Sequence, residues 1–173
     1  MIVGITGHQD LGDAAAVAWV HGTLIEQIAR RRVHRGLSSL AAGADQIFAE
    51  VLQSARIELE AVIPCAGYEV TFGDDAARAG YERSLAVAAS VHRLPFGSPS
   101  EQAFLAAGAW IVSHCDLLIA VWNGLPARGI GGTGDVVALA QAQGRAWLHL
   151  DPVERTVEAS ARTEQEAATQ RDR

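Results

Sequence analysis

The sequence contains little cysteine and no long apolar run, and both shortages restrict the class of protein. Its two cysteines, Cys65 and Cys115, are too widely separated for a metal-site spacing or a disulfide framework. So little cysteine fits a reducing, cytoplasmic compartment. No apolar stretch approaches the ~20 residues that a membrane-spanning helix needs. The sequence therefore predicts a cytoplasmic protein with no membrane partner, no metal site and no disulfide.

Positive charge is also scarce. Lysine and arginine together number 14 against 20 aspartate and glutamate residues, so the formal net charge is −6. Nucleic-acid-binding proteins usually carry a basic face, and this balance predicts no nucleic-acid partner. The first ten residues, MIVGITGHQD, lack a positively charged start and break at Gly7. They are therefore not expected to be a secretion signal.

Two common phosphate-binding motifs are missing from the first glycine-bearing segment, TGHQDLG at residues 6–12. The segment has neither the GxGxxG spacing of the dinucleotide fingerprint nor the lysine of a P-loop. An NTPase of the P-loop kind is therefore not expected.

What the sequence does contain is a regular alternation of short apolar runs and longer helical patterns. The clearest helical pattern runs from Asp13, a predicted N-cap, to about Arg32. The expected strands are Ile2–Thr6, Leu37–Leu40, Ile57–Ile63, Val91–Leu94, Leu117–Trp122 and Ala146–Leu150. Strands that alternate with helices predict an α/β fold, a three-layer, Rossmann-like open parallel sheet with helices on both faces.

The 173 residues, 49% of them hydrophobic, are enough for one domain with a full core. We expect this domain to span residues 1–152. Residues 153–173 are polar, and they are expected to form a surface helix or to be disordered.

Three glycine-bearing loops follow predicted strands: TGHQDLG (6–12), SSLAAGAD (38–45) and WNGLPARGIGGTGD (122–135). Open parallel sheets bind ligands beyond the carboxyl ends of their strands, so these loops are expected to meet at one site. The predicted binding residues are Thr6, Gly7, His8, Gln9, Ser39, Gly43, Asp45, Asn123, Gly124, Gly131, Gly132, Thr133 and Gly134.

The third loop ends in Gly131-Gly132-Thr133-Gly134, at the predicted start of a helix. The first amides of a helix lack intrahelical partners and lie at the positive end of its dipole. They are therefore suited to phosphate, and glycine lets the phosphate oxygens come close. The alternative is a glycine-rich turn in which Thr133 serves only as the N-cap.

Asp45 and His8 each have two interpretations. Asp45 lies in the first turn of a predicted helix, where its carboxylate could bind ribose hydroxyls or could only complement the helix dipole. His8 could contact a ligand beside Gly7, or it could be a solvated loop histidine.

Three further features are weaker indications of function. In the HCD segment at 114–116, neighbours along a helix do not face one another, so Cys115 is expected to be a core residue. The RRRVHR segment at 30–35 is expected to be solvated and to complement a helix dipole. Trp122, beside the third loop, is a candidate for stacking on a base.

Several segments resemble the SLOG superfamily, which joins the Rossmann domain of DNA-processing protein A to the LOG proteins. They are SSLAAGADQIFAEVL (38–52), WIVSHCD (110–116), DLLIAVWNG (116–124) and GGTGDVVALAQAQGR (131–145). The resemblance spans about residues 2–152 and is strongest to small, stand-alone bacterial members. It implies a Rossmann-like fold that binds a nucleotide or a nucleotide derivative. Some LOG members hydrolyse the N-glycosidic bond of nucleoside monophosphates, and other members are thought to sense nucleotide-type signals.

The chain departs from the family pattern at the catalytic glutamate. LOG enzymes carry PGGxGTxxE, but here Ile130 replaces the proline, Asp135 stands where the threonine would, and Ala138 stands where the glutamate would. Against the GTxxE of nucleoside deoxyribosyltransferases, Val136 takes the place of the nucleophile. On either alignment the acid is missing or displaced to Asp135, which is therefore the candidate catalytic residue.

Three hypotheses stay open. The first is a nucleotide-binding domain, with a sensor as one such function, that needs no cofactor besides a phosphate-bearing ligand. The second is an N-glycosidic hydrolase or transferase acting on a nucleoside monophosphate, with Asp135, or else Asp45 or Glu82, stabilising the ribosyl centre or activating water. The third is an interaction domain whose glycine loops are only turns. The sequence leaves a homo-oligomer open.

Overall fold

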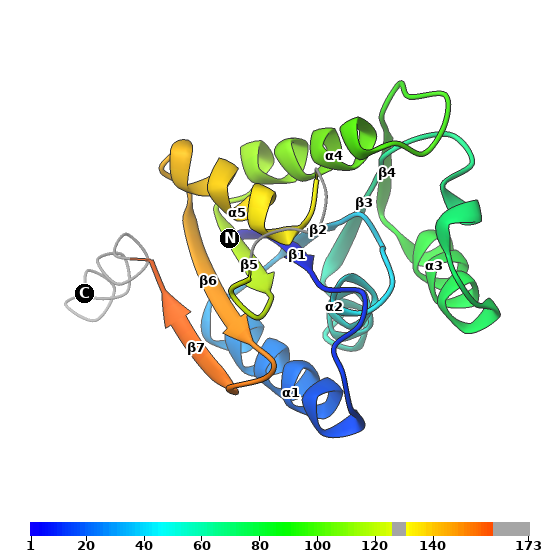
Figure 1. Cartoon of the computed structure of the whole chain (residues 1–173). Helices are drawn as coiled ribbons and strands as arrows, with labels where there is room; N and C mark the ends of the chain where they lie inside the picture. Colours follow the sequence, from blue (N-terminus) through cyan, green and yellow to red (C-terminus); the bar gives the residue numbers. More distant parts are fainter. Residues whose placement is uncertain (126–130, 161–173) are drawn as a thin grey trace.

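A seven-stranded sheet runs through the computed structural model, which describes residues 1–125 and 131–160 (Figure 1). The strand order is β4-β3-β2-β1-β5-β6-β7. The strands are β1 (Ile2–Gly7), β2 (Arg35–Ser38), β3 (Glu58–Ile63), β4 (Ser90–Arg93), β5 (Leu117–Val121), β6 (Ala146–Asp151) and β7 (Thr156–Ala159). All neighbouring pairs are parallel except β6 and β7, which are antiparallel.

Helices cover both faces of the sheet. They are α1 (Ala14–Arg30), α2 (Ala44–Ser54), α3 (Asp75–Val87), α4 (Glu101–His114) and α5 (Thr133–Ala142), with a short 3₁₀ helix, η1 (Tyr68–Thr71). In Figure 1, α1 and α2 lie on one face with α3 beside α2, and α4 and α5 lie on the other. The predicted three-layer, Rossmann-like α/β fold is confirmed.

Local sequence signals explain where the helices begin. Asp13, Asp74 and Ser100 each precede a helix, and each side chain accepts a hydrogen bond from the backbone amide three residues later. Such caps satisfy amides that have no partner within the helix. The predicted N-cap at Asp13 is confirmed.

The centre of the sheet is the core of the molecule. Strand β5 is buried at every position, as expected for a central strand of a parallel sheet that helices cover on both faces. Val3 and Ile5 of β1 pack toward the α1 and α2 side, whereas Leu118 of β5 packs with Ile111 and Val136 of α4 and α5. Among the described residues, no helix has the length and apolar character needed to span a membrane.

Two strands differ from the sequence prediction. Strand β2 ends at Ser38 rather than Leu40, because Leu40 adopts left-handed backbone with a φ of 60° and turns the chain out of the strand. Strand β7 lies in the segment expected to be a polar tail. All four of its residues are exposed, so the strand contributes no buried apolar residue that would mark it in the sequence. The rest of that tail, residues 161–173, lies outside the described residues.

The strand order reverses between β1 and β5. Strands β2 to β4 follow one another on one side of β1, whereas β5 to β7 lie on its other side. Such a reversal opens a crevice at the carboxyl ends of the two central strands, where open α/β sheets bind their ligands.

Candidate ligand-binding site

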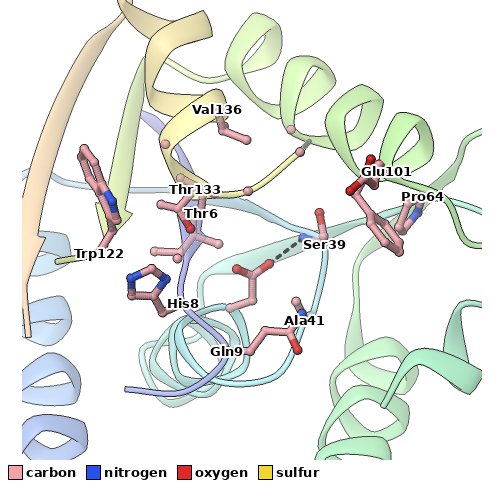
Figure 2. A pocket seen from close by; sticks show the side chains of 18 of the residues that line it. Thr6, His8, Gln9, Ser39, Ala41, Pro64, Glu101, Trp122, Thr133 and Val136 are labelled. Atoms are coloured by element: carbon pink, nitrogen blue, oxygen red, sulfur yellow. Dashed lines mark hydrogen bonds between the residues drawn. The ribbon is translucent and has the colours of Figure 1, made fainter. Parts of the chain in front are cut away.

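A cavity of about 1070 Å³ lies at this reversal point. We call it the carboxyl-edge pocket. The loops that follow β1, β2 and β5 line it, together with the first residues of α4 and α5 (Figure 2). The sequence placed three glycine-bearing loops at one edge of the sheet, and the structure brings all three together.

Most of the predicted binding residues line the pocket. They are Thr6, Gly7, His8, Gln9, Ser39, Asp45, Asn123, Gly131, Gly132, Thr133 and Gly134. Gly43, Gly124 and Asp135 are not among the lining residues that the structure describes. A direct role for each lining residue in binding stays a prediction, because the geometry shows their position only.

The loops after β1 and β5 are tied to each other. The His8 side chain shares a hydrogen bond of 3.0 Å between its Nε2 and Oδ1 of Asn123. The His8 amide donates to the carbonyl of Val121 at 2.9 Å. His8 is therefore not a freely solvated loop histidine, and it fixes the spacing of two pocket walls.

Gly43 does not line the pocket, but it positions the loop after β1, which does. Its φ is +76°, and a Cβ at this position would meet the backbone carbonyl oxygens of His8 and Gln9. The adjacent Ala44 amide donates to the His8 carbonyl at 3.1 Å. Glycine at position 43 thus lets the start of α2 pack directly on the loop after β1.

Asp45 is a buried carboxylate in the pocket wall, with 4% of the residue exposed. Its Oδ2 accepts hydrogen bonds from the Ser38 hydroxyl at 2.9 Å and from the Ser39 amide at 3.0 Å. The second bond is the dashed line that ends at Ser39 in Figure 2. The Ser38 hydroxyl accepts in turn from the Leu40 amide at 3.0 Å. Asp45 therefore holds the loop after β2 in place, which is more than complementing the dipole of α2.

Burial changes the proton affinity of this carboxylate. Loss of hydration raises the pKa of Asp45 to about 7 from an ordinary value of 3.8, although hydrogen bonds from Ser38 and from nearby backbone amides oppose the rise. Burial, followed by the charge of Asp45, also raises the pKa of Tyr68. The pocket wall thus contains a carboxyl group that exchanges a proton near neutral pH and a phenol that stays protonated.

The start of α5 supplies the glycine-rich wall. Gly131, with a φ of +86°, packs so closely on α4 that an added Cβ would lie 2.9 Å from the carbonyl oxygen of Glu101. Gly132 is the N-cap of α5 and offers no capping side chain. The amides of the first turn that follows have no partner inside the helix, so the predicted phosphate cradle keeps its donors at Thr133 and Gly134.

Asp135 makes a different contact from the one expected. Its Oδ2 accepts a hydrogen bond of 2.8 Å from the Gly131 amide, so the carboxylate closes the glycine loop onto α5. That bond occupies one of the four amides predicted to hold phosphate. A catalytic role for Asp135 has no support from this placement and stays a prediction.

Two other candidate residues also lie away from the lining. Glu82 is exposed on α3 and forms an ion pair with Arg78, as expected for two charges one helical turn apart. Gly124 has a φ of +74° in the turn after β5, which explains glycine there without a ligand. Ile130, the residue in place of the family's proline, lies outside the described residues.

Trp122 lines the pocket at the end of β5, as expected for a residue that could stack on a base. Its indole Nε1 donates to the Leu125 carbonyl at 2.6 Å, and its own carbonyl lies 2.7 Å from Nε2 of His149. The ring is therefore held in one orientation.

The sequence analysis missed the far wall of the pocket. Tyr68 of η1, Phe104 and Glu101 of α4, and Ser100 before it all line the cavity. Tyr68 packs its ring against Phe104 at a centroid distance of 6.1 Å. The aromatic residues gave no signal that they would line a pocket, and Glu101 was indistinguishable from an ordinary first-turn acid. An acidic residue directly after the Ser100 cap was the only available signal.

Charge in the pocket is mostly negative. The described lining residues include Asp10, Asp45 and Glu101, one histidine, and no arginine. Among the described residues, no group of three or more histidine, cysteine, aspartate or glutamate side chains is arranged to hold a metal ion.

Cys115 and His114 of the HCD segment lie in surroundings that favour a structural role over a catalytic one. Cys115 is buried, and burial raises the pKa of its thiol to about 11, so the thiolate is disfavoured at neutral pH. His114 stacks on Trp110 at a centroid distance of 3.9 Å. Neither residue is among those that line the pocket.

Comparisons with known proteins find similar folds among solved structures but no match in sequence. No family model and no curated protein matches the sequence. DNA processing protein A from Streptococcus pneumoniae is similar in structure, with a TM-score of 0.59 and 17% identity over 85% of this chain and 49% of the other. This chain therefore spans about half the length of that protein.

Two further solved structures are similar. A molybdenum cofactor binding protein from Rippkaea orientalis has a TM-score of 0.58 and 18% identity over 87% of this chain and 76% of its own. DNA processing protein A from Helicobacter pylori has a TM-score of 0.58 and 18% identity over 86% of this chain and 64% of its own. The Rossmann-like fold that the SLOG resemblance implied is confirmed by these neighbours.

One expectation is overturned by the same comparison. The acidic composition predicted no nucleic-acid partner, yet the neighbour from Helicobacter pylori binds single-stranded DNA. A net charge averages over the whole surface and does not describe a local face. Excluding nucleic acid on this basis was wrong.

Proposed function

We propose that the protein binds a nucleotide, or a related small molecule with one phosphate group, in the carboxyl-edge pocket. The observation that carries the proposal is the convergence of three glycine-bearing loops on one cavity of about 1070 Å³ at the reversal of strand order. Ligand cavities of this size hold a molecule of several hundred daltons.

Different parts of the pocket wall suit different parts of such a ligand. The first-turn amides of α5 and Thr133 lie in the wall between Trp122 and Glu101 (Figure 2), and they favour a phosphate. Trp122 and the Tyr68–Phe104 pair offer ring surfaces against which a base can pack.

The charges favour a ligand with few phosphates. Three carboxylates and no arginine are present among the described lining residues. A triphosphate would bring several negative charges close to Glu101 and to Asp45, which is only partly ionised near neutral pH, and like charges repel strongly where water is scarce. A nucleoside monophosphate therefore fits the pocket better than a triphosphate does.

Calorimetric titration of the purified chain tests the proposal. The probes are adenosine and guanosine, their 5′-monophosphates and triphosphates, and a single-stranded oligonucleotide. We expect the monophosphates to bind most tightly. No binding of any mononucleotide would refute the proposal, as would a triphosphate that binds about tenfold more tightly than its monophosphate. Salt-sensitive binding of the oligonucleotide alone would identify nucleic acid as the ligand instead.

A glycine substitution then locates the phosphate. Gly132 has a φ of −72°, which valine also adopts, so Gly132→Val should leave the fold intact and block the approach of phosphate. We expect affinity to fall by about tenfold or more. Gly22→Val is the matched control, because a Cβ at this position in α1 meets no atom within 4 Å. Unchanged affinity in a folded Gly132→Val protein would place the phosphate elsewhere.

A second candidate function is N-glycosidic cleavage, and the Asp45 carboxyl group is the observation that favours it. Burial and a pKa of about 7 are properties of an acid–base group near neutral pH. Release of free base from a nucleoside monophosphate by the parent, reduced about 100-fold in Asp45→Asn with binding retained, would support it. Absence of base release by the parent protein would reject it.

A further inference from the structure

A second hollow lies at the opposite edge of the sheet from the pocket. Its volume is about 460 Å³, and it lies where α1 and α2 end and lead into β2 and β3. Ile28, Val33 and Val51 are buried in it, whereas Ile25 is 48% exposed. We call this hollow the amino-edge groove.

The lining of the amino-edge groove is aliphatic. Arg32 and Ser54 are its polar residues, and the other lining residues are isoleucine, valine and alanine. It offers no aromatic ring on which a base could stack. Ile28, Val33 and Val51 are buried around a hollow, so the groove suits the entry of an apolar side chain better than insertion into a lipid surface.

Both helices beside the groove end in a left-handed arginine. Arg32 follows α1 with a φ of +49°, and Arg56 follows α2 with a φ of +56°. A left-handed residue at the end of a helix is usually glycine, because a Cβ is crowded there.

Helix α5 shows what the same turn looks like with glycine. Gly144 follows its C-cap with a φ of +61°, and the next amide, that of Arg145, donates to the Ala140 carbonyl at 2.8 Å. After Arg56, the amide of Ile57 donates in the same way to Leu52 at 2.9 Å. The turn therefore does not need arginine for its hydrogen bonds.

The two left-handed arginines have no partners within the described residues. No hydrogen bond or ion pair there involves the side chain of Arg32 or Arg56, and both residues are exposed. Their neighbours are engaged within α1, where Arg30 forms an ion pair and Arg31 donates a hydrogen bond to Gln27. A protein of net charge −6 thus presents two unpaired guanidinium groups beside an apolar groove.

We infer that the amino-edge groove binds an acidic, amphipathic segment of another protein. Aliphatic side chains of that segment enter the groove, and its carboxylates pair with Arg32 and Arg56. Guanidinium groups match carboxylates in charge and in hydrogen-bond geometry. An apolar groove with charged rims is a common site for a short amphipathic segment.

Peptide selection on the full-length chain tests this inference. The probe is a displayed library of short random peptides, selected on immobilised protein, and one enriched peptide is then labelled for fluorescence anisotropy. We expect the enriched peptides to combine aspartate or glutamate with leucine, isoleucine or phenylalanine. We also expect their affinity to fall as salt is raised.

Two variants and one control locate the contact. The double variant Arg32→Gly/Arg56→Gly should bind the peptide about tenfold more weakly or worse, and Ile25→Gln should weaken binding through the apolar side chains. The control is Arg155→Gly, which removes a third left-handed arginine, with a φ of +54°, from the turn between β6 and β7. All glycine variants should melt at or above the parental temperature, because glycine suits these backbone angles.

Several results would overturn the inference. They are an enrichment of basic peptides, no enrichment at all, and equal affinity of the double variant for the selected peptide. Cosedimentation of the parent, but not the double variant, with vesicles of anionic phospholipid would show that the amino-edge groove and its two arginines bind a lipid surface. Self-association that the double variant abolishes, measured by sedimentation velocity, would show that a second copy occupies the groove.

Discussion

The loops after β1, β2 and β5 and the ends of α1 and α2 place different residues in left-handed backbone. The three loops use glycine, as at Gly12, Gly43 and Gly124, whereas the ends of α1 and α2 at the amino edge use arginine. Glycine allows neighbouring backbone or a ligand to come close, and arginine extends a charge into solvent. The comparison shows that the left-handed φ alone does not determine the residue type. The surroundings of the residue, either close backbone or open solvent, matter as well.

Leu40 is the exception that supports this interpretation. It lies at the carboxyl edge with a φ of +60°, yet its side chain is fully buried in the core. A leucine there gains burial that offsets the strained backbone. The strained backbone of Leu40 is thus accompanied by full burial of its side chain.

The largest expected difference between the edges is in their response to pH. Asp45 has a folded pKa of about 7 against an ordinary 3.8, so the folded protein binds more protons between these values. The contribution of Asp45 to the free energy of unfolding should therefore be fully present at or below about pH 4 and should be lost as pH rises to about 7, by an amount on the order of 4 kcal/mol.

Asp45→Asn, which cannot ionise, should remove this pH-dependent loss. Urea denaturation at about pH 5 and about pH 8 measures it. The arginine variants at the amino edge should keep the slope of the parent. An unchanged slope in Asp45→Asn would show that the carboxyl group is not the source.

Gly43→Ala should have the next largest effect. The new Cβ would meet the carbonyl oxygens of His8 and Gln9 at a φ of +76°, so both strain and collision oppose it. We expect the free energy of unfolding to fall by about 3 kcal/mol. Gly67→Ala separates the two causes, because Gly67 has a φ of +68° but no atom within 4 Å of an added Cβ. It should lose about 1 kcal/mol, and equal losses would refute the role of the collision.

Asp135→Asn should have the smallest effect. It weakens the charge-assisted hydrogen bond from the Gly131 amide, and we expect the free energy of unfolding to fall by about 1 kcal/mol. Asp116→Asn is the matched change at the amino edge, where the carboxylate accepts from the Ile2 amide at 2.7 Å.

Both variants should retain nucleotide binding better than Gly132→Val does, which calorimetry can compare. A loss of affinity in Asp135→Asn as large as that in Gly132→Val would show that the Asp135 carboxylate contacts the ligand after all.

Much of the carboxyl edge was predictable because its signals are local. Strand and helix patterns placed the glycine-bearing loops after β1, β2 and β5, and the parallel topology then brought them together. Asp13 was predictable as a cap for the same reason. The contact made by Asp135 was not, because a first-turn carboxylate can turn toward a ligand or back to its own loop.

The rest depends on tertiary structure that no short segment encodes. Tyr68 and Glu101 come to the pocket from connections around β3 and β4, and their place depends on how the chain crosses the sheet. The RRRVHR segment predicted only charges at a helix end. That Arg32 lines an apolar hollow, and that both sequence neighbours of Arg56, Ala55 and Ile57, line the same hollow, required the packing of α1 on α2.

Strand β7 has a consequence for how the protein behaves in concentrated solution. A chain cut after Pro152, where the sequence suggested that the domain ends, would leave β6 as an uncovered edge strand. Strand β6 carries Leu148 and Leu150 in a mostly buried row, and bare edges of this kind template pairing between molecules. The four exposed residues of β7 cover that edge and present Glu158 to solvent. We therefore expect β7 to reduce aggregation through the edge of β6, an effect that is separate from ligand binding.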